Sequence, residues 1–514
     1  MKVVSVASMR ALDERTIAAG TTGHVLMERA GRQVFLALHE FIATRLGPRH
    51  AQRIVVLAGK GNNGGDAYVV ARLLAEASRT AVTVCAVCPV GELKGDARRH
   101  AEALPASVPV VVCDELPAAA RSPGTVLVDG LLGTGFSGPL RAPYDRWIRS
   151  VNDSGLPVVA IDIPSGLNGE TGETQPEAVV ADLTVTLAQP KAGLITENGL
   201  AHCGVMRCAD IGIPPAFVER TAGCGEALFA ADAAALLRRR PHASHKGTFG
   251  TVLVAGGSSL YVGAPFLAGA AALRSGAGLV TVAVPARARQ AAQPPLAALI
   301  VRAMPDADTG LFGVACAESL RVLLGDARAA VFGPGIGSCP EGETVLRMLL
   351  TSDRPLVLDA DGLRLLARHP DCAPATAPLV LTPHPGEMRA LLTGFGLERL
   401  LAARRTEQAM ALAQRTRAFV VLKGLGTVIA APDGRVAVNT SGTSGLATAG
   451  SGDVLAGLLG GLLAQGMAPW EALCLGVFVH GLAAELAPTG NRALVADDLL
   501  PLIGHAFREL SPFA

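Results

Sequence analysis

The stretch RIVVLAGKGNNGGDAYVVARLLAEA, residues 53–77, sets the pattern for the first half of the chain. It begins with an apolar run over 53–58 that is rich in β-branched residues, as in a buried strand. A glycine-rich turn follows over 59–66, and residues 67–77 have a helical pattern. A strand, a turn and a helix in this order predict one unit of a parallel α/β sheet.

The same alternation continues along the first 215 residues. A helical pattern covers 144–152, and short apolar runs bounded by Gly, Pro or Asp cover 81–87, 108–112, 126–129 and 157–162. Near-continuous apolar strands separated by helices indicate a parallel sheet that is covered on both faces. Functional residues in such sheets gather at the carboxyl ends of the strands.

A second block of alternating segments follows a break in the pattern. The alternation lapses near 211–215 and resumes at Gly250, so we expect a linker and a domain boundary near residue 225. The later helices begin near Gly452, Pro469 and Ala496, and the expected strands cover 250–255, 279–284, 329–332, 355–358, 379–382 and 419–422. We therefore predict an α/β protein with two domains, 1–224 and 225–514, the first of them a three-layer, Rossmann-like domain.

The composition excludes several classes of protein. Half of the 514 residues are hydrophobic, 17% are charged and the mean hydropathy is +0.39, which rules out a largely disordered chain. The formal net charge of +1 does not show the strong positive charge that is typical of proteins that bind nucleic acid or an anionic membrane. The apolar stretch 454–464 is too short and too rich in glycine to span a bilayer. We expect a cytoplasmic protein with small-molecule partners, no nucleic-acid or membrane partner, and an oligomeric state that the sequence leaves open.

Polar residues follow several of the expected strands in the first domain. The three loops concerned are 59–66, 129–135 and 162–168. Because the carboxyl ends of parallel strands meet at one edge of a sheet, Asn63, Asp129 and Ser165 could supply hard oxygen ligands to a cation. Asp162 would then remain as an acid/base candidate. Taken singly, each Asp could equally be a turn or cap residue at a strand end.

These motifs together resemble the NAD(P)H-hydrate epimerase domain over roughly the first 215 residues. The motifs are Leu-Met-Glu-Arg-Ala-Gly at 26–31, Asn-Asn-Gly-Gly-Asp at 62–66, the loop 129–135 and Asp-Ile-Pro-Ser-Gly at 162–166. The resemblance implies interconversion of the R and S hydrates at C6 of a nicotinamide ring, with Asp162 as acid/base. It also implies a K⁺ site at Asn63, Asp129 and Ser165. The residues implied to contact the hydrate are Asn62, Asn63, Gly64, Gly65, Asp66, Gly133, Thr134, Gly135, Phe136, Ser137, Gly138, Pro139 and Asp162.

The second half carries another group of loop motifs, each placed after an expected strand or before a helix. They are Gly-Pro-Gly-Ile-Gly at 333–337, Thr-Pro-His-Pro-Gly-Glu at 382–387, Lys-Gly-Leu-Gly-Thr at 423–427 and Gly-Ser-Gly-Asp at 450–453. Backbone N–H groups at 450–452 would form an anion site at a helix N-terminus. Asp453 could then accept a proton from an attacking hydroxyl, or simply compensate the helix dipole. For His384 the alternative is a hydrogen-bonded structural histidine.

This second group resembles the ribokinase-like kinases and, more narrowly, the ADP/ATP-dependent NAD(P)H-hydrate dehydratase domain. The match extends over almost all of 240–510 and includes His-Lys-Gly-Thr-Phe-Gly at 245–250; the family's usual Gly-Thr-Gly-Asp reads Gly-Ser-Gly-Asp here. The resemblance implies a ribokinase-like α/β domain with a mainly parallel sheet and with Asp453 as catalytic base. The implied hydrate-binding residues are Ala264, Gly335, His384 and Asp453. The implied nucleotide-binding residues are Lys423, Gly424, Leu425, Gly426, Thr427 and Gly452.

The two resemblances together predict a fused metabolite-repair enzyme. Phosphorylation turns the C6 hydroxyl into a good leaving group, so the second domain would convert the S hydrates NADHX and NADPHX back to NADH and NADPH. Fusions of this layout use ADP with Mg²⁺ and give AMP and phosphate, although these residues do not separate ADP from ATP. One alternative is a vitamin-precursor kinase with a non-catalytic first domain. Another is a first domain that serves only as a binding module, as in scaffold proteins of RNA turnover.

Overall fold

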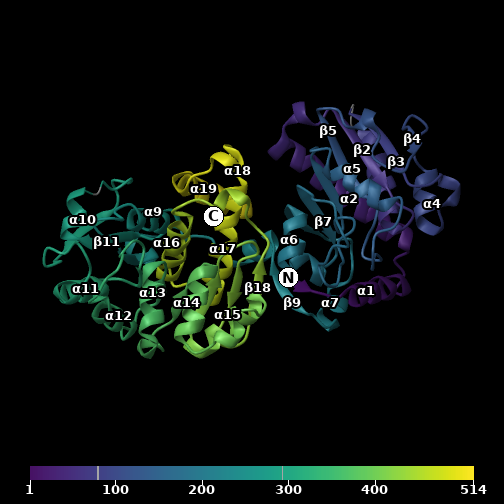
Figure 1. The fold of residues 1–514 in the computed structure, drawn as a ribbon. Helices are drawn as coiled ribbons and strands as arrows, with labels where there is room; N and C mark the ends of the chain where they lie inside the picture. Colours follow the sequence, from purple (N-terminus) through teal and green to yellow (C-terminus); the bar gives the residue numbers. More distant parts are fainter. Residues whose placement is uncertain (78–79, 292, 514) are drawn as a thin grey trace. The chain divides into compact units, whose positions relative to one another are not determined.

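A computed structural model describes residues 1–77, 80–291 and 293–513 (Figure 1). The chain forms two compact units, Met1–Ala227 and Leu228–Ala514. The expected domains 1–224 and 225–514 include residues 78–79, 292 and 514, which lie outside the described residues. Both units are α/β with mainly parallel sheets, as predicted.

The first unit is built on a parallel sheet with the order β4-β3-β2-β5-β6-β7-β8. Successive strands run outward in one direction from β2 and in the other from β5, so the order reverses between these two neighbours. In such sheets a ligand crevice opens at the carboxyl ends of the strands on either side of the reversal. The strands are β2 Arg53–Ala58, β3 Ala81–Ala86, β4 Val110–Val112, β5 Thr125–Gly130, β6 Val158–Ile161, β7 Leu183–Leu187 and β8 Val205–Ala209.

Helices flank this sheet and bury its apolar strands, among which β2, β5 and β6 are covered almost completely. The helices are α1 Val6–Ala18, α2 Gly23–Phe41, α3 Asn62–Ala77, α4 Gly95–Glu102, α5 Tyr144–Asn152, α6 Glu197–Cys203 and α7 Pro215–Arg220. The prediction of α5 was correct at both ends, because its strongly amphipathic sequence buries Trp147 and Ile148.

The glycine-rich turn expected over 59–66 is shorter than predicted, because α3 already begins at Asn62. Close packing explains why glycine occupies the first turn of this helix. A Cβ atom on Gly64 would lie 2.0 Å from the Gly59 carbonyl oxygen, and one on Gly65 would lie 2.5 Å from the Met27 sulfur. Gly64 therefore lets α3 pack against the preceding loop and Gly65 lets it pack against α2, while Asn62, Asn63 and Asp66 all lie on α3.

The linker expected near residue 225 is instead a β-strand, β9 Gly225–Leu228, which pairs antiparallel with β1 Lys2–Val3. The Met1 amino group donates to the Ala227 carbonyl at 2.8 Å, and the Ala227 N–H donates to the Met1 carbonyl. The short segment has little apolar periodicity, so its pairing with a distant strand was not visible in the sequence.

The second unit repeats the same principle with another strand order, β18-β17-β16-β15-β14-β13-β10-β11-β12. Its order reverses between β10 and β13, and β16, β17 and β18 are joined antiparallel. The strands are β10 Thr251–Ala255, β11 Leu279–Pro285, β12 Ile300–Met304, β13 Ala329–Phe332, β14 Leu356–Leu358, β15 Leu379–Leu381, β16 Phe419–Leu422, β17 Val428–Ala430 and β18 Val436–Asn439.

The helices of the second unit include two that are buried on nearly every side, α16 and α17. Gly457 allows α16 to touch α9, since a Cβ there would lie 1.9 Å from the Ala268 carbonyl oxygen. The helices are α8 Ala230–Leu236, α9 Ala264–Arg274, α10 Ala286–Ala291, α11 Ala317–Asp326, α12 Gly342–Leu350, α13 Asp361–Arg368, α14 Pro385–Gly394, α15 Arg405–Thr416, α16 Ser451–Ala464, α17 Pro469–Glu485, α18 Gly490–Ala493 and α19 Ala496–Leu510. Among the described residues, no helix is both long and apolar enough to cross a membrane.

Candidate active sites

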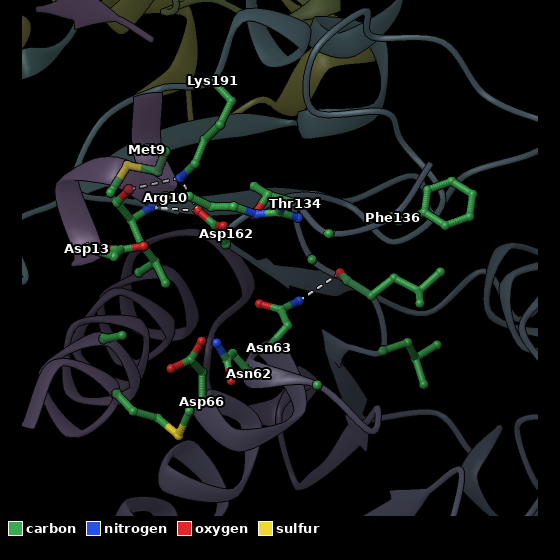
Figure 2. A pocket seen from close by; sticks show the side chains of 18 of the residues that line it. Met9, Arg10, Asp13, Asn62, Asn63, Asp66, Thr134, Phe136, Asp162 and Lys191 are labelled. Atoms are coloured by element: carbon green, nitrogen blue, oxygen red, sulfur yellow. Dashed lines mark hydrogen bonds and ion pairs between the residues drawn. The ribbon is translucent and has the colours of Figure 1, made fainter. Parts of the chain in front are cut away.

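A pocket of about 800 Å³ opens in the first unit where the strand order reverses (Figure 2). Its walls come from α1, from the first turns of α3, from the loop after β5 and from the end of β6. The predicted residues that line it are Asn62, Asn63, Asp66, Gly133, Thr134, Gly135, Phe136, Ser137, Pro139 and Asp162. Gly64, Gly65 and Gly138 do not line the pocket; the first two are occupied in helix packing.

Asp162 forms a buried ion pair with Lys191 at the edge of this pocket. Its Oδ1 atom accepts hydrogen bonds from the Lys191 ammonium group and, at 3.0 Å, from the Leu187 N–H. Lys191 is 1% exposed and also donates to the Leu187 carbonyl at 2.9 Å, so its charge is held in place. Asp162 itself has a left-handed backbone with φ of 63°, a conformation that is uncommon for residues other than glycine and that occurs at functional sites as well as in turns.

Besides Asp162, the carboxyl groups of Asp13, Asp66 and Asp96 line the same pocket, and Figure 2 shows the first two of these. Asp66 on α3 is 7% exposed, and burial together with the neighbouring charges of Asp162 and Asp13 raises its pKa well above the ordinary value. Burial also raises the pKa of Asp13 on α1 to about 6, with Lys191 opposing the shift. The pocket therefore combines a paired carboxylate with carboxyl groups that keep a proton at higher pH than usual.

The three expected K⁺ ligands meet around the backbone of Leu131 and Leu132. Asn63 Nδ2 donates to the Leu132 carbonyl at 2.8 Å, while the Ser165 hydroxyl accepts from the Leu132 N–H at 2.8 Å. Asp129 lies within β5 and is fully buried, with Ser165 donating from its hydroxyl at 2.6 Å and from its N–H at 2.8 Å. One carboxylate among neutral amide, hydroxyl and carbonyl oxygens is a donor set that suits a monovalent cation, so these residues fit K⁺.

The second unit gathers charged side chains at the ends of the neighbouring strands β14, β15 and β16. Lys423 follows β16 and its Nζ lies 2.6 Å from Oδ1 of Asp359, which follows β14. The Thr382 hydroxyl, after β15, donates to the same oxygen at 2.7 Å, and Glu387 Oε2 lies 4.0 Å from Lys423 Nζ. Burial lowers the pKa of Lys423, but the charges of Asp359 and Glu387 outweigh burial and raise it overall.

Asp453 lies in the first turn of α16, against this cluster. Burial and the charge of Asp359 raise the pKa of Asp453 to about 7, while Lys423 lowers it. The helix begins after Gly450, whose φ of 88° gives the left-handed turn that glycine adopts without strain. A Cβ on Gly452 would lie 3.1 Å from Lys423 Nζ, so the lysine reaches the helix N-terminus where anions are favoured.

Of the residues implied for hydrate binding, Ala264 and Gly335 lie after β10 and β13 at the reversal point of the second sheet, and His384 follows β15. Gly335 has φ of 69°, and a Cβ there would lie 3.3 Å from Cβ of Ala264, so these two residues are neighbours. His384 caps α14: its Nδ1 accepts from the Gly386 N–H at 2.9 Å, and its Nε2 lies 3.3 Å from Glu387 Oε1. Burial and the Lys423 charge lower its pKa, which favours a neutral imidazole. This helix cap is the hydrogen-bonded structural role that the sequence analysis gave as the alternative for His384.

Arg405, the first residue of α15, fixes the loop 423–427 through hydrogen bonds. Its guanidinium group donates to the carbonyl oxygens of Leu422 and Lys423 at 3.0 Å each, to that of Gly426 at 3.3 Å and to that of Leu425. These bonds turn the carbonyl groups toward the protein. Gly424 and Gly426 provide the positive φ angles, 134° and 60°, that this tight loop requires.

The sequence patterns did not reveal the partner residues Lys191, Asp359, Glu387 and Arg405, nor Asp13. Lys191 and Asp162 are 29 residues apart, and Lys423 and Asp359 are 64 apart, so their pairing depends on which strands are neighbours. An available signal for Lys191 was the run Leu-Thr-Val-Thr-Leu at 183–187, which forms β7 and was not predicted. Asp359 directly follows an expected strand, as Asp162 follows β6, so its place at a strand end was a signal for a functional residue.

Each of the two α/β units therefore carries an acid–lysine cluster at the carboxyl ends of its strands. A family model described as NAD(P)H-hydrate dehydratase matches residues 252–503, and one described as YjeF-related protein N-terminus matches residues 23–193. The bifunctional NAD(P)H-hydrate repair enzyme Nnr of Coxiella burnetii is 39% identical over 96% of this chain and 96% of its own length. The chain belongs to the family of bifunctional NAD(P)H-hydrate repair enzymes.

Two further similarities accompany this assignment. The bifunctional NAD(P)H-hydrate repair enzyme Nnr of Salinibacter ruber is 38% identical over 98% of this chain and 95% of its own length. Among solved structures, the ADP/ATP-dependent NAD(P)H-hydrate dehydratase of Bacillus subtilis, co-crystallized with ATP and Mg²⁺, is 30% identical, with a TM-score of 0.48. It covers 56% of this chain and 100% of its own.

Proposed function

We propose that the first unit interconverts the R and S hydrates of NADH and NADPH, and that the second dehydrates the S form with ADP as phosphoryl donor. The observation that carries this proposal is that each unit pairs a lysine, buried in the first unit and partly buried in the second, with one carboxylate beside a carboxyl group of raised pKa. Each of these clusters lies at the carboxyl ends of its sheet, where α/β enzymes bind ligands. Family membership across nearly the whole chain supports both halves and favours this function over a vitamin-precursor kinase.

In the second unit, Asp453 would act as the base for phosphoryl transfer. A pKa of about 7 leaves a substantial ionised fraction at neutral pH, and a base of this strength can take the proton of the C6 hydroxyl as the phosphoryl group arrives. The N-terminus of α16 and Lys423 would stabilise the transferring phosphoryl group, whose loss as phosphate then restores the dihydronicotinamide. Ala264, Gly335 and His384 would hold the hydrate, and Lys423–Thr427 with Gly452 would hold the nucleotide.

Mg²⁺ and K⁺ belong to the proposal as the metal ions of the two units. Mg²⁺ takes few protein ligands and several phosphate oxygens, so Asp359 and Glu387 fit a site shared with the nucleotide. When bound, it would neutralise charge on the phosphates. Asn63, Asp129 and Ser165 would hold K⁺ beneath the first pocket and so fix the loop that carries Gly133 to Pro139.

The decisive test is incubation of the protein with mixed NADHX epimers, and separately NADPHX epimers, while NADH or NADPH absorbance is followed. We expect complete conversion with ADP and Mg²⁺, faster with K⁺ than with Na⁺, and a comparison with ATP identifies the donor. In Asp129→Ala, K⁺ should no longer accelerate epimerisation, while dehydration of pure S hydrate stays normal. Turnover of a vitamin alcohol with none of either hydrate would contradict the proposal.

A further inference from the structure

The unexplained group in the first pocket is the carboxyl of Asp66. It lies on α3 in the wall of the pocket and is more than nine-tenths buried, yet it lines the cavity (Figure 2). Within the described part of the chain, its side chain forms no hydrogen bond or ion pair, whereas Asp162 is bound by Lys191 and by the Leu187 N–H. A buried polar group without a partner costs stability, so its retention needs a ligand-directed reason.

The proposed epimerisation requires two proton transfers on opposite faces of the ring. A hydroxyl leaves C6 more easily when an acid protonates it, and water that returns from the other face must lose a proton to a base. A single carboxyl would have to serve both faces of C6. Two carboxyl groups on different elements could serve one face each, and pockets in which the environment separates the pKa values of two acids divide acid and base roles in this way.

We propose that Asp66 is a second catalytic residue of the first pocket, which protonates the C6 hydroxyl on one face while Asp162 accepts a proton on the other. The assignment rests on the proposed epimerase function. Asp66 suits the acid because its carboxyl group is buried and, within the described residues, has no hydrogen-bond or ion-pair partner, and Asp162 suits the base because it forms an ion pair with Lys191. Asp13 is less buried, and its pKa of about 6 leaves it mostly ionised at neutral pH.

Protons and electron pairs balance over the two halves of the reaction. The Asp66 carboxyl gives its proton to the C6 hydroxyl, the C6–O bond breaks, and the ring nitrogen forms a C=N⁺ bond as water departs. A second water adds to C6 from the opposite face, the C=N⁺ electrons return to nitrogen, and the new hydroxyl is completed by loss of a proton to Asp162. The proton returns from Asp162 to Asp66 through pocket water, or the reverse epimerisation returns it.

The test starts full-length protein with pure R hydrate and no nucleotide, and it measures S hydrate by chromatography across the pH range. We expect Asp66→Asn to slow epimerisation by about 10²-fold with little change in KM. The alkaline limb of the wild-type profile, where the acid loses its proton, should disappear in Asp66→Asn. Besides Asp66, the titratable or charged groups that line the pocket are Arg10 and Asp13 on α1, Asp96 on α4, Tyr144 on α5, and Arg141, Asp162 and Lys191.

Three comparisons keep the outcome clear. Asp66→Glu restores an acid and should regain part of the rate together with the alkaline limb, and Asp114→Asn, an exposed carboxylate paired with Arg146, should behave as wild type. An unchanged KM for the R hydrate shows that the first unit of a slow variant is folded, and normal dehydration of pure S hydrate shows that the second unit is intact. A wild-type rate in Asp66→Asn, or a slow rate with the alkaline limb unchanged, would overturn the proposal; wild-type protein that does not epimerise would overturn the proposed function itself.

Discussion

The two units contain similar acid–lysine clusters, but the second carboxyl group of each cluster lies in a different environment. Each pairs a lysine with a carboxylate at a strand end, the buried Lys191 with Asp162 and the partly buried Lys423 with Asp359, beside a second carboxyl group of raised pKa. In the second unit that carboxyl group, Asp453, is in the first turn of a helix, where backbone N–H groups attract anions. Asp66 lies in the second turn of α3, away from free N–H groups. The first arrangement suits proton transfer alone, and the second also suits a transferring phosphoryl group.

The largest effect should come from removing the base of the second unit. We expect Asp453→Asn to lower dehydration of pure S hydrate by about 10³-fold, because the amide cannot accept the hydroxyl proton. NADH absorbance with saturating ADP measures the loss, and epimerisation measured without nucleotide should be unchanged. The exposed Asp433→Asn, whose carboxylate pairs with Arg435, is the matched control. Near-normal dehydration in Asp453→Asn would show that Asp453 is not the base of the second unit.

A second substitution should remove epimerisation and leave dehydration intact. Asp162→Asn keeps an acceptor for the Leu187 N–H but cannot take a proton, so we expect enzymatic epimerisation to fall by about 10²-fold. The NADH progress curve from mixed epimers should change from one phase to a fast partial phase and a slow tail at the spontaneous rate. Asp182→Asn, at the amino end of β7, should retain a single phase. A single phase in Asp162→Asn would refute its role.

The lysine of the second unit should control the pH dependence of dehydration. As a base, Asp453 is active when ionised, so the rate should rise with pH through its pKa of about 7. Lys423 lowers this pKa, and Lys423→Met should therefore move the limb to higher pH and reduce the rate at neutral pH by about tenfold. The pH profile of kcat at saturating ADP checks this, with Arg321→Met as the exposed-cation control. An unmoved limb would show that Lys423 does not act on Asp453.

The smallest effect concerns the loop that the first unit lacks. Arg405→Lys cannot reproduce the fork of hydrogen bonds to the carbonyl groups of 422–426, so the loop 423–427 should loosen. We expect about a three- to tenfold rise in KM for ADP with little change in kcat. The neighbouring Arg404→Lys alters only an exposed pair with Glu407 and serves as control. An unchanged KM would mean that the loop does not contact the nucleotide.

Much of the fold was predictable because it depends on local pattern. The strands at 329–332 and 419–422 and the helix at 144–152 lie where the sequence placed them, since apolar runs and amphipathic periodicity act over a few residues. The position of Asp453 in a first helical turn likewise followed from the Gly-Ser-Gly-Asp motif. Strands β1, β7, β8, β12, β17 and β18 were not predicted, and β9 lies where the sequence indicated a linker.

By itself, then, the sequence determined that strands and helices alternate in two blocks and that glycine-rich loops with Asn, Asp and Ser follow the strands. Only the tertiary structure decided which of these loops meet. Lys191 reaches Asp162, and Lys423 reaches Asp359, because β6 and β7 are neighbours and β15 alone lies between β14 and β16. The raised pKa values of Asp66 and Asp453 have the same origin, since burial and neighbouring charge are properties of the packed chain and not of any residue in it.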